Sequence, residues 1–244
     1  MSAGAAGGAA IRVLVVEHED DAPAAWVGRW LVDAGAELDV RRPYLGQELP
    51  VDLADHDALL VLGGEMGATD DHLPWIVPTK ELIARAAADG VPTLGICLGH
   101  QLCTVALGGA VVRNPRGQQM GVLDVGWAED ASADPLLGPV VGAAVAVHWN
   151  SDVVTEVPEG ARVLARAPGG EVQAVRLAPS VWGVQPHPEV DEEVVASWAP
   201  FSRAVHGDGP VDEALAGIAA ARDELHASWR QLAAALVRLA GDRR

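Results

Sequence analysis

The stretch LGICLGHQ at residues 94–101 places Cys97 between two glycines at the end of an apolar run. When a strand enters a helix through so tight a turn, the side chain of the turn residue projects from the edge of the sheet, as in a nucleophile elbow. Gly95 and Gly99 lack side chains, so strand and helix can approach closely and leave the sulfur exposed at the sheet edge. The N–H groups at the start of the helix favour a thiolate and can hold an oxyanion. The pattern therefore predicts a cysteine nucleophile for acyl transfer.

A second stretch, GVQPHPEV at residues 183–190, offers a base for that thiol. Pro186 and Pro188 keep it from being helical, and residues two apart in an extended chain face the same way. His187 and Glu189 therefore lie on one side, where the carboxylate can orient the imidazole. Together with the cysteine they predict a catalytic triad.

The elements that must position these residues alternate between strands and helices. Apolar, β-branched runs predict buried strands, and helical spacing of apolar residues that ends at glycine predicts helices. The predicted strands are 11–18, 37–43, 56–64 and 91–97, and the predicted helices are 23–35, 74–90 and 98–109. Strands that are apolar throughout, with helices between them, indicate a mostly parallel central sheet covered on both faces.

The rest of the chain follows other patterns. From about 110 to 185, short strands broken by glycine and proline predict a small antiparallel section attached to the sheet. Residues 191–240 predict two C-terminal helices, so the expected fold class is α/β with a helical end. Residues 1–10 lack the cationic start and leucine-rich centre of a signal peptide, and we expect a disordered leader.

LGICLGHQL and GVQPHPEV together resemble the class I (triad) glutamine amidotransferases, which carry the motifs G-x-C-x-G-x-Q and H-P-E. The resemblance implies a flavodoxin-like amidotransferase domain over residues 11–190, with residues 191–244 as a helical extension of the same domain. The helical tail and a W-x-S-D segment make the chain most similar to stand-alone relatives of the glutaminase domain of GMP synthase. The plant γ-glutamyl peptidases are similar to that group.

The resemblance implies a role for each matching residue. Cys97 matches the nucleophile, His187 the base and Glu189 the residue that orients it. The backbone N–H of Leu98 matches one oxyanion donor, and Gly64, in the turn LGGEMGA, matches the second. The residues that match contacts to the amino-acid end of the substrate are Gln101, Ser151 and Asp152.

Two positions depart from the family pattern. Glu65 stands where relatives often have proline, and a carboxylate beside the oxyanion turn opposes a developing negative charge unless it points away. Asn150 stands where relatives often have histidine. Neither departure removes a member of the triad, and both bear on which substrate is used.

The chemistry that the resemblance implies begins with attack of the thiolate on the γ-carboxamide of glutamine. This step gives a thioester and ammonia, and water then hydrolyses the thioester without a metal or an organic cofactor. About 55 residues follow Glu189, too few for a synthetase domain. We therefore expect any ammonia-accepting synthetase to be a separate protein.

Two alternatives remain open at this point. A γ-glutamyl peptidase would use the same triad on γ-glutamyl peptides or conjugates, and a catalytically idle regulatory or binding subunit would not use it. A peptidase must accommodate the carboxylate of a peptide. Arg113 and Arg116 are the cations nearest to the nucleophile helix in the sequence, and they could serve if their loop folds back.

Charge and composition exclude several kinds of partner. The chain has 34 acidic and 17 basic residues and a net charge of −17, whereas nucleic acid binding needs clustered Lys and Arg. No apolar run is long enough to span a bilayer. Cys97 and Cys103, if both are helical, are roughly 9 Å apart along the axis, too far for a disulfide. Nothing requires an oxidising compartment, so the cytoplasm is the default.

Three further patterns favour structural interpretations. The C-x2-H-x2-C pattern at 97–103 could suggest a metal site, but positions six apart lie on opposite helix faces, so one ion does not reach all three ligands. The acidic stretch EHEDD at 17–21 is expected to be a solvated loop. Trp149 and Trp182 are expected near the site. The tryptophans expected in the core are Trp26, Trp30, Trp198 and Trp229.

Overall fold

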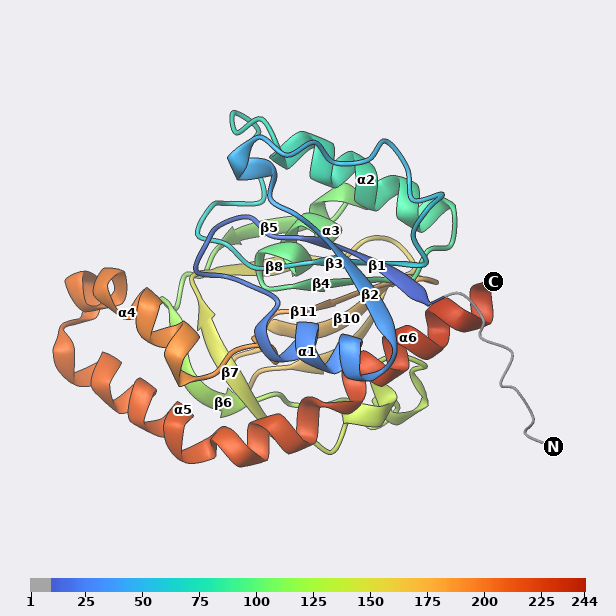
Figure 1. Cartoon of the computed structure of the whole chain (residues 1–244). Coiled ribbons are helices and arrows are strands. Elements are labelled where there is room, and N and C mark those ends of the chain that lie inside the picture. Colours follow the sequence, from blue (N-terminus) through green and yellow to red (C-terminus); the bar gives the residue numbers. More distant parts are fainter. Residues whose placement is uncertain (1–9) are drawn as a thin grey trace.

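The computed structural model describes residues 10–244 and has a seven-stranded central sheet with the order β2-β1-β3-β4-β11-β10-β9 (Figure 1). The first five strands in this order are parallel, and β10 and β9 continue the sheet antiparallel. The strands are β1 (Ile11–Val16), β2 (Ala36–Arg41), β3 (Ala58–Val61), β4 (Thr93–Ile96), β9 (Arg162–Arg166), β10 (Val172–Ala178) and β11 (Val181–Val184). The predicted mostly parallel α/β fold is confirmed. The leader predicted over 1–10 lies outside the described residues, apart from Ala10.

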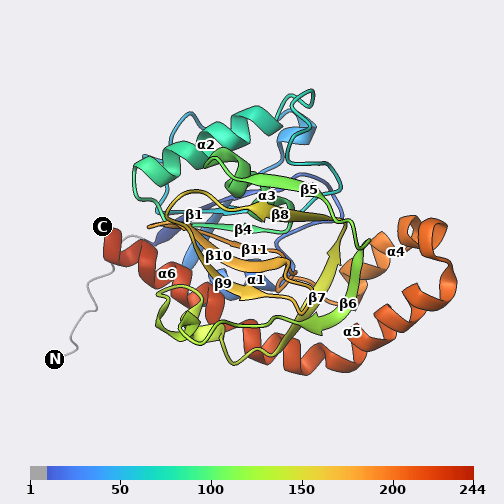
Figure 2. The ribbon, with the colours of Figure 1, turned by 180° about the vertical axis from the view of Figure 1, so that it is seen from behind.

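Helices cover both faces of the sheet because its inner strands are apolar on both sides. Every residue of β3, β4 and β11 is buried. Alternate residues of β1 belong to two separate cores, one shared with α1 and α6 and the other with α2 and α3. Figures 1 and 2 show these pairs of helices on opposite faces. The helices are α1 (Ala25–Asp33), α2 (Ile76–Ala88), α3 (Leu98–Ala106) and α6 (Gln231–Arg243).

The antiparallel section is more divided than the sequence predicts. Strands β9 and β10 join the central sheet, and the others form two separate two-stranded ribbons. One ribbon pairs β5 (Ala110–Arg113) with β8 (Asp152–Glu156), and the other pairs β6 (Gln119–Asp124) with β7 (Val145–Asn150). Glycine and proline breaks mark where short strands end but do not determine their partners, which depend on residues distant in the sequence.

The C-terminal residues form three helices where two were predicted: α4 (Glu192–His206), α5 (Asp208–Trp229) and α6. The division between α5 and α6 falls beside Trp229, which is fully buried and donates its indole N–H to the carbonyl of Val145 at 3.1 Å. Trp229, Leu232 and Leu236 belong to the same apolar core as α1 and the sheet. No helix within residues 10–244 is both long and apolar enough to cross a membrane.

Candidate active site

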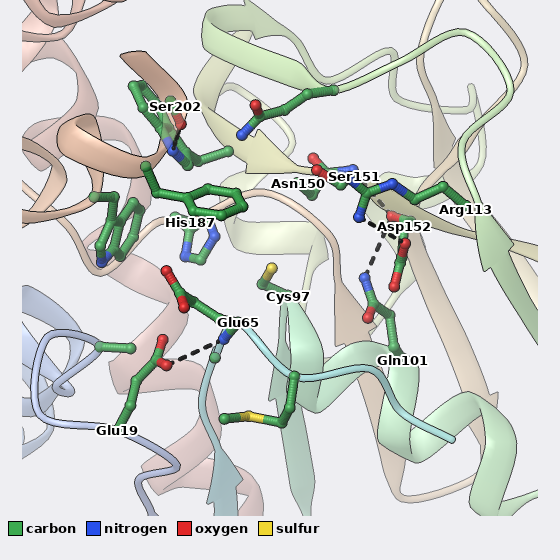
Figure 3. Close-up of a pocket in the computed structure, with 17 residues that line it drawn as sticks. Glu19, Glu65, Cys97, Gln101, Arg113, Asn150, Ser151, Asp152, His187 and Ser202 are labelled. Carbon is green, nitrogen blue, oxygen red and sulfur yellow. Dashed lines mark hydrogen bonds and ion pairs between the residues drawn. The ribbon is translucent and has the colours of Figure 1, made fainter. Parts of the chain in front are cut away.

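Cys97 stands at the turn between β4 and α3, as the sequence predicts. Its φ of +50° and ψ of −107° lie in a region that residues with a side chain rarely adopt. The turn is possible because neighbouring side chains are missing. A Cβ on Gly95 would collide with the backbone of Gly99, and a Cβ on Gly99 would collide with the carbonyl of Val61. Strand and helix therefore meet backbone to backbone, and the thiol faces a pocket (Figure 3).

His187 and Glu189 follow β11, which lies directly beside β4 in the sheet. Because the two strands are parallel, the residues after their carboxyl ends meet at the same edge. The Nδ1–H of His187 donates to Oε1 of Glu189 at 2.7 Å. The backbone N–H of His187 donates to the carbonyl of Val147, also at 2.7 Å. The structure thus brings together the three residues predicted as a triad, with the imidazole held by the carboxylate.

The surroundings of His187 favour the protonated form of its imidazole. Burial by itself lowers the pKa of His187, but the charges of Cys97 and Glu189 and the hydrogen bonds to both raise it to about 10. His187 and Glu189 are 4% and 2% exposed, so water screens their interaction little. At neutral pH the imidazole holds its proton, so it can stabilise negative charge on the neighbouring sulfur and can give the proton to a leaving group.

The two expected oxyanion donors lie on turns that contact each other. Leu98 is the first residue of α3, so its N–H belongs to the turn that lacks intrahelical acceptors. Gly64 lines the pocket, and a Cβ there would lie 3.0 Å from the Leu98 side chain. The next N–H along, that of Glu65, donates to Oε2 of Glu19 at 3.2 Å.

The residues expected to hold the amino-acid end of a substrate, Gln101, Ser151 and Asp152, all line this pocket, whose volume is about 190 Å³. The Gln101 amide donates to the carbonyl of Asp152 at 3.3 Å and to Oε1 of Gln185 at 3.2 Å. With both hydrogens engaged, Gln101 offers a substrate only its oxygen, which accepts from an ammonium group. Arg113 Nη1 lies 3.6 Å from the Asp152 carboxylate at the same end of the pocket.

Both departures from the family pattern fall in the pocket. Glu65 is exposed there, and its carboxylate points into the space beside His187 (Figure 3). Asn150 is 3% exposed and donates from Nδ2 to the carbonyl of Asp152 and to Oε1 of Gln119, both at 3.1 Å. Asn150 therefore braces the turn between β7 and β8.

Gln185 is a site residue that the sequence analysis missed. It is fully buried, and its Nε2 donates to the Cys97 sulfur at 3.5 Å while its Oε1 accepts from Gln101. The amide thus joins the thiol to the substrate end of the pocket. The signal was present, because the alternation that places Glu189 on the side of His187 places Gln185 there as well.

Two tryptophans exchange the roles expected of them. Trp198, expected in the core, lines the pocket from α4 and packs on His187 with ring centroids 4.8 Å apart. Trp182, expected near the site, is 2% exposed in the core and donates its indole N–H to Asp134 at 3.1 Å. Trp149 lines the pocket as expected. Nothing in the helical spacing of α4 indicates which of its residues reaches the sheet edge.

The acidic stretch at 17–21 is not the solvated loop expected from the sequence. Glu17 and His18 are 4% and 1% exposed, and Glu19 lines the pocket. Burial raises the pKa of Glu19 to about 7, and the charges of Asp21 and Glu65 add to the rise. The loop follows β1, and the carboxyl end of β1 lies at the same sheet edge as that of β4.

Two residues of the C-x2-H-x2-C pattern, His100 and Cys103, belong to the packing of α3. His100 and Cys103 are fully buried in α3. Burial lowers the pKa of His100 to about 3 and raises that of Cys103 to about 12. His100 packs against Gly183, where a Cβ would collide with the imidazole. Within residues 10–244, no group of three or more His, Cys, Asp or Glu side chains could hold a metal ion.

A thiol, an imidazole and a carboxylate at the carboxyl edge of a parallel sheet are typical of acyl-transfer enzymes with a cysteine nucleophile. Comparison with known proteins narrows this class. The family described as glutamine amidotransferase class-I matches residues 21–197. The chain belongs to this family.

Several relatives indicate the range of proteins to which the chain is similar. It is 31% identical to the glutamine amidotransferase-like protein YfeJ of Salmonella typhimurium, over 76% of this chain and 78% of that one. It is 36% identical to the glutamine-hydrolysing GMP synthase of Aeropyrum pernix, over 63% of this chain and 28% of that one. It is 30% identical to γ-glutamyl peptidase 5 of Arabidopsis thaliana, over 59% and 58%. A glutamine amidotransferase structure from Thermotoga maritima shares the fold with a TM-score of 0.81 at 21% identity, over 96% and 99%.

Proposed function

We propose that this protein hydrolyses the γ-carboxamide of glutamine through a thioester on Cys97 and supplies the ammonia to a separate acceptor enzyme. The observation that carries the proposal is the buried cluster of Cys97, His187 and Glu189, whose charges hold His187 protonated. Membership of the glutamine amidotransferase class-I family supports the same chemistry.

The proposed reaction has two steps. The Cys97 thiolate attacks the γ-carbonyl carbon, and Leu98 and Gly64 donate their N–H groups to the oxyanion. The C–N bond then breaks as His187 gives its proton to the leaving nitrogen, and ammonia departs. In the second step His187 takes a proton from water, which attacks the thioester and releases glutamate. Glu189 keeps the imidazole oriented throughout.

The substrate end of the pocket suits the zwitterionic end of glutamine. The Gln101 oxygen accepts from the α-ammonium group, since both of its amide hydrogens are engaged elsewhere. Arg113 attracts the α-carboxylate from the same end, and Asp152 offers a second partner to the ammonium. Ser151 lies between them in the chain and lines the same wall.

A separate acceptor enzyme is proposed from the relatives. The match to the GMP synthase of Aeropyrum pernix covers 28% of that protein, so most of the relative has no counterpart in the match. We therefore propose that ammonia made at Cys97 is consumed by another chain.

A second candidate is a γ-glutamyl peptidase, favoured by the wall that α4 adds to the pocket. Trp198 and Phe201 both line the pocket, and Trp198 packs on His187, so an aromatic wall adjoins the imidazole and suits a leaving group larger than ammonia. Of the two arginines considered for a peptide carboxylate, Arg113 lines the pocket, but it lies at the end proposed for the amino-acid group of the substrate. Arg116 pairs with Glu171 at 3.2 Å and lines a different cavity.

The test is kcat/KM for glutamine and for glutathione on the isolated protein, with Cys97→Ala as the blank. We expect glutamine to be preferred. A preference for glutathione of more than about tenfold, roughly 1.4 kcal/mol in transition-state binding, would favour the peptidase. Absence of turnover with both substrates, with and without candidate acceptors, would favour an idle regulatory subunit.

A further inference from the structure

The leaving half of the pocket is acidic. The leaving nitrogen of a γ-glutamyl amide must lie on the His187 side of Cys97, because His187 gives it a proton. Figure 3 shows Glu19 and Glu65 on this side, and both line the pocket. Their two segments are joined where the N–H of Glu65 donates to Glu19 at 3.2 Å. Whatever the leaving nitrogen carries therefore meets two carboxyl groups.

The basic side chain that lines the pocket, Arg113, lies at the end opposite Glu19 and Glu65. Among the lysines and arginines of residues 10–244, only Arg113 lines the pocket, and it lies 3.6 Å from Asp152. Figure 3 shows Arg113, Asp152 and Gln101 across Cys97 from the acidic side. Within residues 10–244, no lysine or arginine therefore lines the His187 side of the pocket, where it could pair with a carboxylate on the leaving group.

Two aromatic side chains of α4 also line the pocket. Trp198 packs on His187 at 4.8 Å between ring centroids, and Phe201, one turn further along α4, is 63% exposed at the pocket. Aromatic faces attract cations, with the ammonium group among the preferred ligands. Carboxyl groups and aromatic rings in one pocket form a surface suited to an extended, positively charged amine.

We propose that this site has a further activity, the hydrolysis of γ-glutamyl amides whose leaving amine carries a second, positively charged group, such as a diamine. The inference rests on the proposed function, since it uses the same thiol and imidazole. Amines that carry a carboxylate, including those released from γ-glutamyl peptides, are disfavoured because Glu19 and Glu65 repel them. A bound cation also offsets the repulsion between Glu65 and the oxyanion.

The reaction balances without any further reactant than water. A bond forms between the Cys97 sulfur and the γ-carbon, the C–N bond breaks, and His187 supplies the proton that the amine takes away. Water then cleaves the thioester, so that each γ-glutamyl amide and one water give glutamate and one free diamine.

The experiment compares three amides of equal length and different terminal charge. The probes are N5-(4-aminobutyl)glutamine, N5-pentylglutamine and N5-(4-carboxybutyl)glutamine, with glutamine as the reference, at pH 8 on the full chain. We expect kcat/KM to be highest for the cationic 4-aminobutyl amide, lower for the neutral pentyl amide and lowest for the anionic 4-carboxybutyl amide. The value for the cationic probe should be at least about tenfold above that for the anionic one. Added salt at about 0.5 M should reduce this ratio, because the interaction is electrostatic.

Two variants assign the selectivity to its residues. Glu65→Gln and Glu19→Gln should each lower the ratio of cationic to anionic kcat/KM severalfold, while Glu37→Gln, an exposed carboxylate on β2, should leave the ratio unchanged. Because the ratio compares two probes on one preparation, partial misfolding of a variant does not affect it.

The outcomes separate the two proposals. If glutamine is hydrolysed but the cationic and anionic probes react equally, or the anionic one faster, the selectivity is overturned and the proposed function stands. A ratio unmoved in both Glu65→Gln and Glu19→Gln also overturns it. If the wild-type chain hydrolyses none of the four amides, with and without candidate acceptors, the proposed function fails, and the further activity with it.

Discussion

Cys97 is held in a backbone conformation that costs on the order of 1–3 kcal/mol for a residue with a side chain. The sheet and α3 maintain it because Gly95 and Gly99, which have no side chains, let the strands and the helix approach closely on either side. In this conformation Cys97 lines the pocket, and Gln185 donates to its sulfur at 3.5 Å. Cys97 is 7% exposed and lines the pocket, whereas Cys103, in ordinary helical geometry, is fully buried in the core.

The two thiols should therefore differ in reactivity. Cys97→Ala should abolish hydrolysis and labelling by a glutamine-like diazoketone, because burial raises the pKa of Cys103 to about 12 and keeps it a thiol. Cys103→Ala should retain both. Mass spectrometry of the labelled protein identifies the residue, and a label on Cys103 would contradict the assignment.

Substitutions of His187 and of Glu189 should lower the activity of the protein to different extents. His187→Ala should lower kcat/KM by about 10³-fold, because both the base and the proton donor are removed. Glu189→Gln should cost less, since an amide can still hold the ring while the imidazolium loses a charged partner. Steady-state kinetics measures both. Activity within a few-fold of wild type in His187→Ala would mean that another residue is the base.

Glu19 should make stability depend on pH. Its pKa is about 7 in the folded chain against an ordinary value of 4.5, so between these values the folded state holds a proton that the unfolded state has lost. Stability should therefore fall as pH rises from about 4.5 to 7. Glu19→Gln should raise Tm over wild type at pH 8 more than at pH 5. An equal difference in Tm between variant and wild type at pH 5 and pH 8 would show that Glu19 is not desolvated.

At the scale of elements, the sequence indicates which residues are strands and helices more reliably than which elements become neighbours. The motif glycines predict the elbow because only close backbone contact requires them at that spacing. The position of β11 beside β4 is not visible in either motif, since a run of four buried residues has no marker for its partner. For the same reason Trp198 on α4 was predicted as core, and Glu19 as solvated.

The contact of α3 with β3 should tolerate no methyl group. Gly99→Ala would place a Cβ against the carbonyl of Val61 and should cost about 3 kcal/mol or more of unfolding free energy, as overpacking does. Gly217→Ala is the matched control, because nothing lies within 4 Å of a Cβ there and alanine favours the interior of α5. Urea unfolding measures both, and equal stability of the two variants would refute the close approach.

At the scale of the molecule, the C-terminal helices share the core of the sheet. The indole N–H of Trp30 in α1 donates to His226 in α5 at 3.1 Å, and Arg244 pairs with Asp57 at 2.7 Å. We therefore propose that residues 191–244 extend the domain of residues 11–190. Helical periodicity predicted that these helices exist, but their docking site depends on which face of the sheet the other helices leave open.

Heat should accordingly unfold the chain in a single transition. Trp229→Ala removes a fully buried side chain of α5 and should cost about 3–5 kcal/mol, moving the whole transition to lower temperature. Phe201→Ala, at a side chain 63% exposed on α4, should leave Tm nearly unchanged. Calorimetry distinguishes the alternatives. Two transitions, only one of them shifted by Trp229→Ala, would indicate a separate domain.

The neighbouring positions of β4 and β11 also govern how the protein comes into being on the ribosome. His187 is translated 90 residues after Cys97, a delay of about 5 to 18 s at ordinary rates of synthesis. Until β11 is inserted beside β4, the thiol has neither its imidazole nor the amide of Gln185. A chain that has not yet reached β11 therefore lacks the complete site, and the hydrolysis proposed here is expected only after residue 189 has been synthesised and folded.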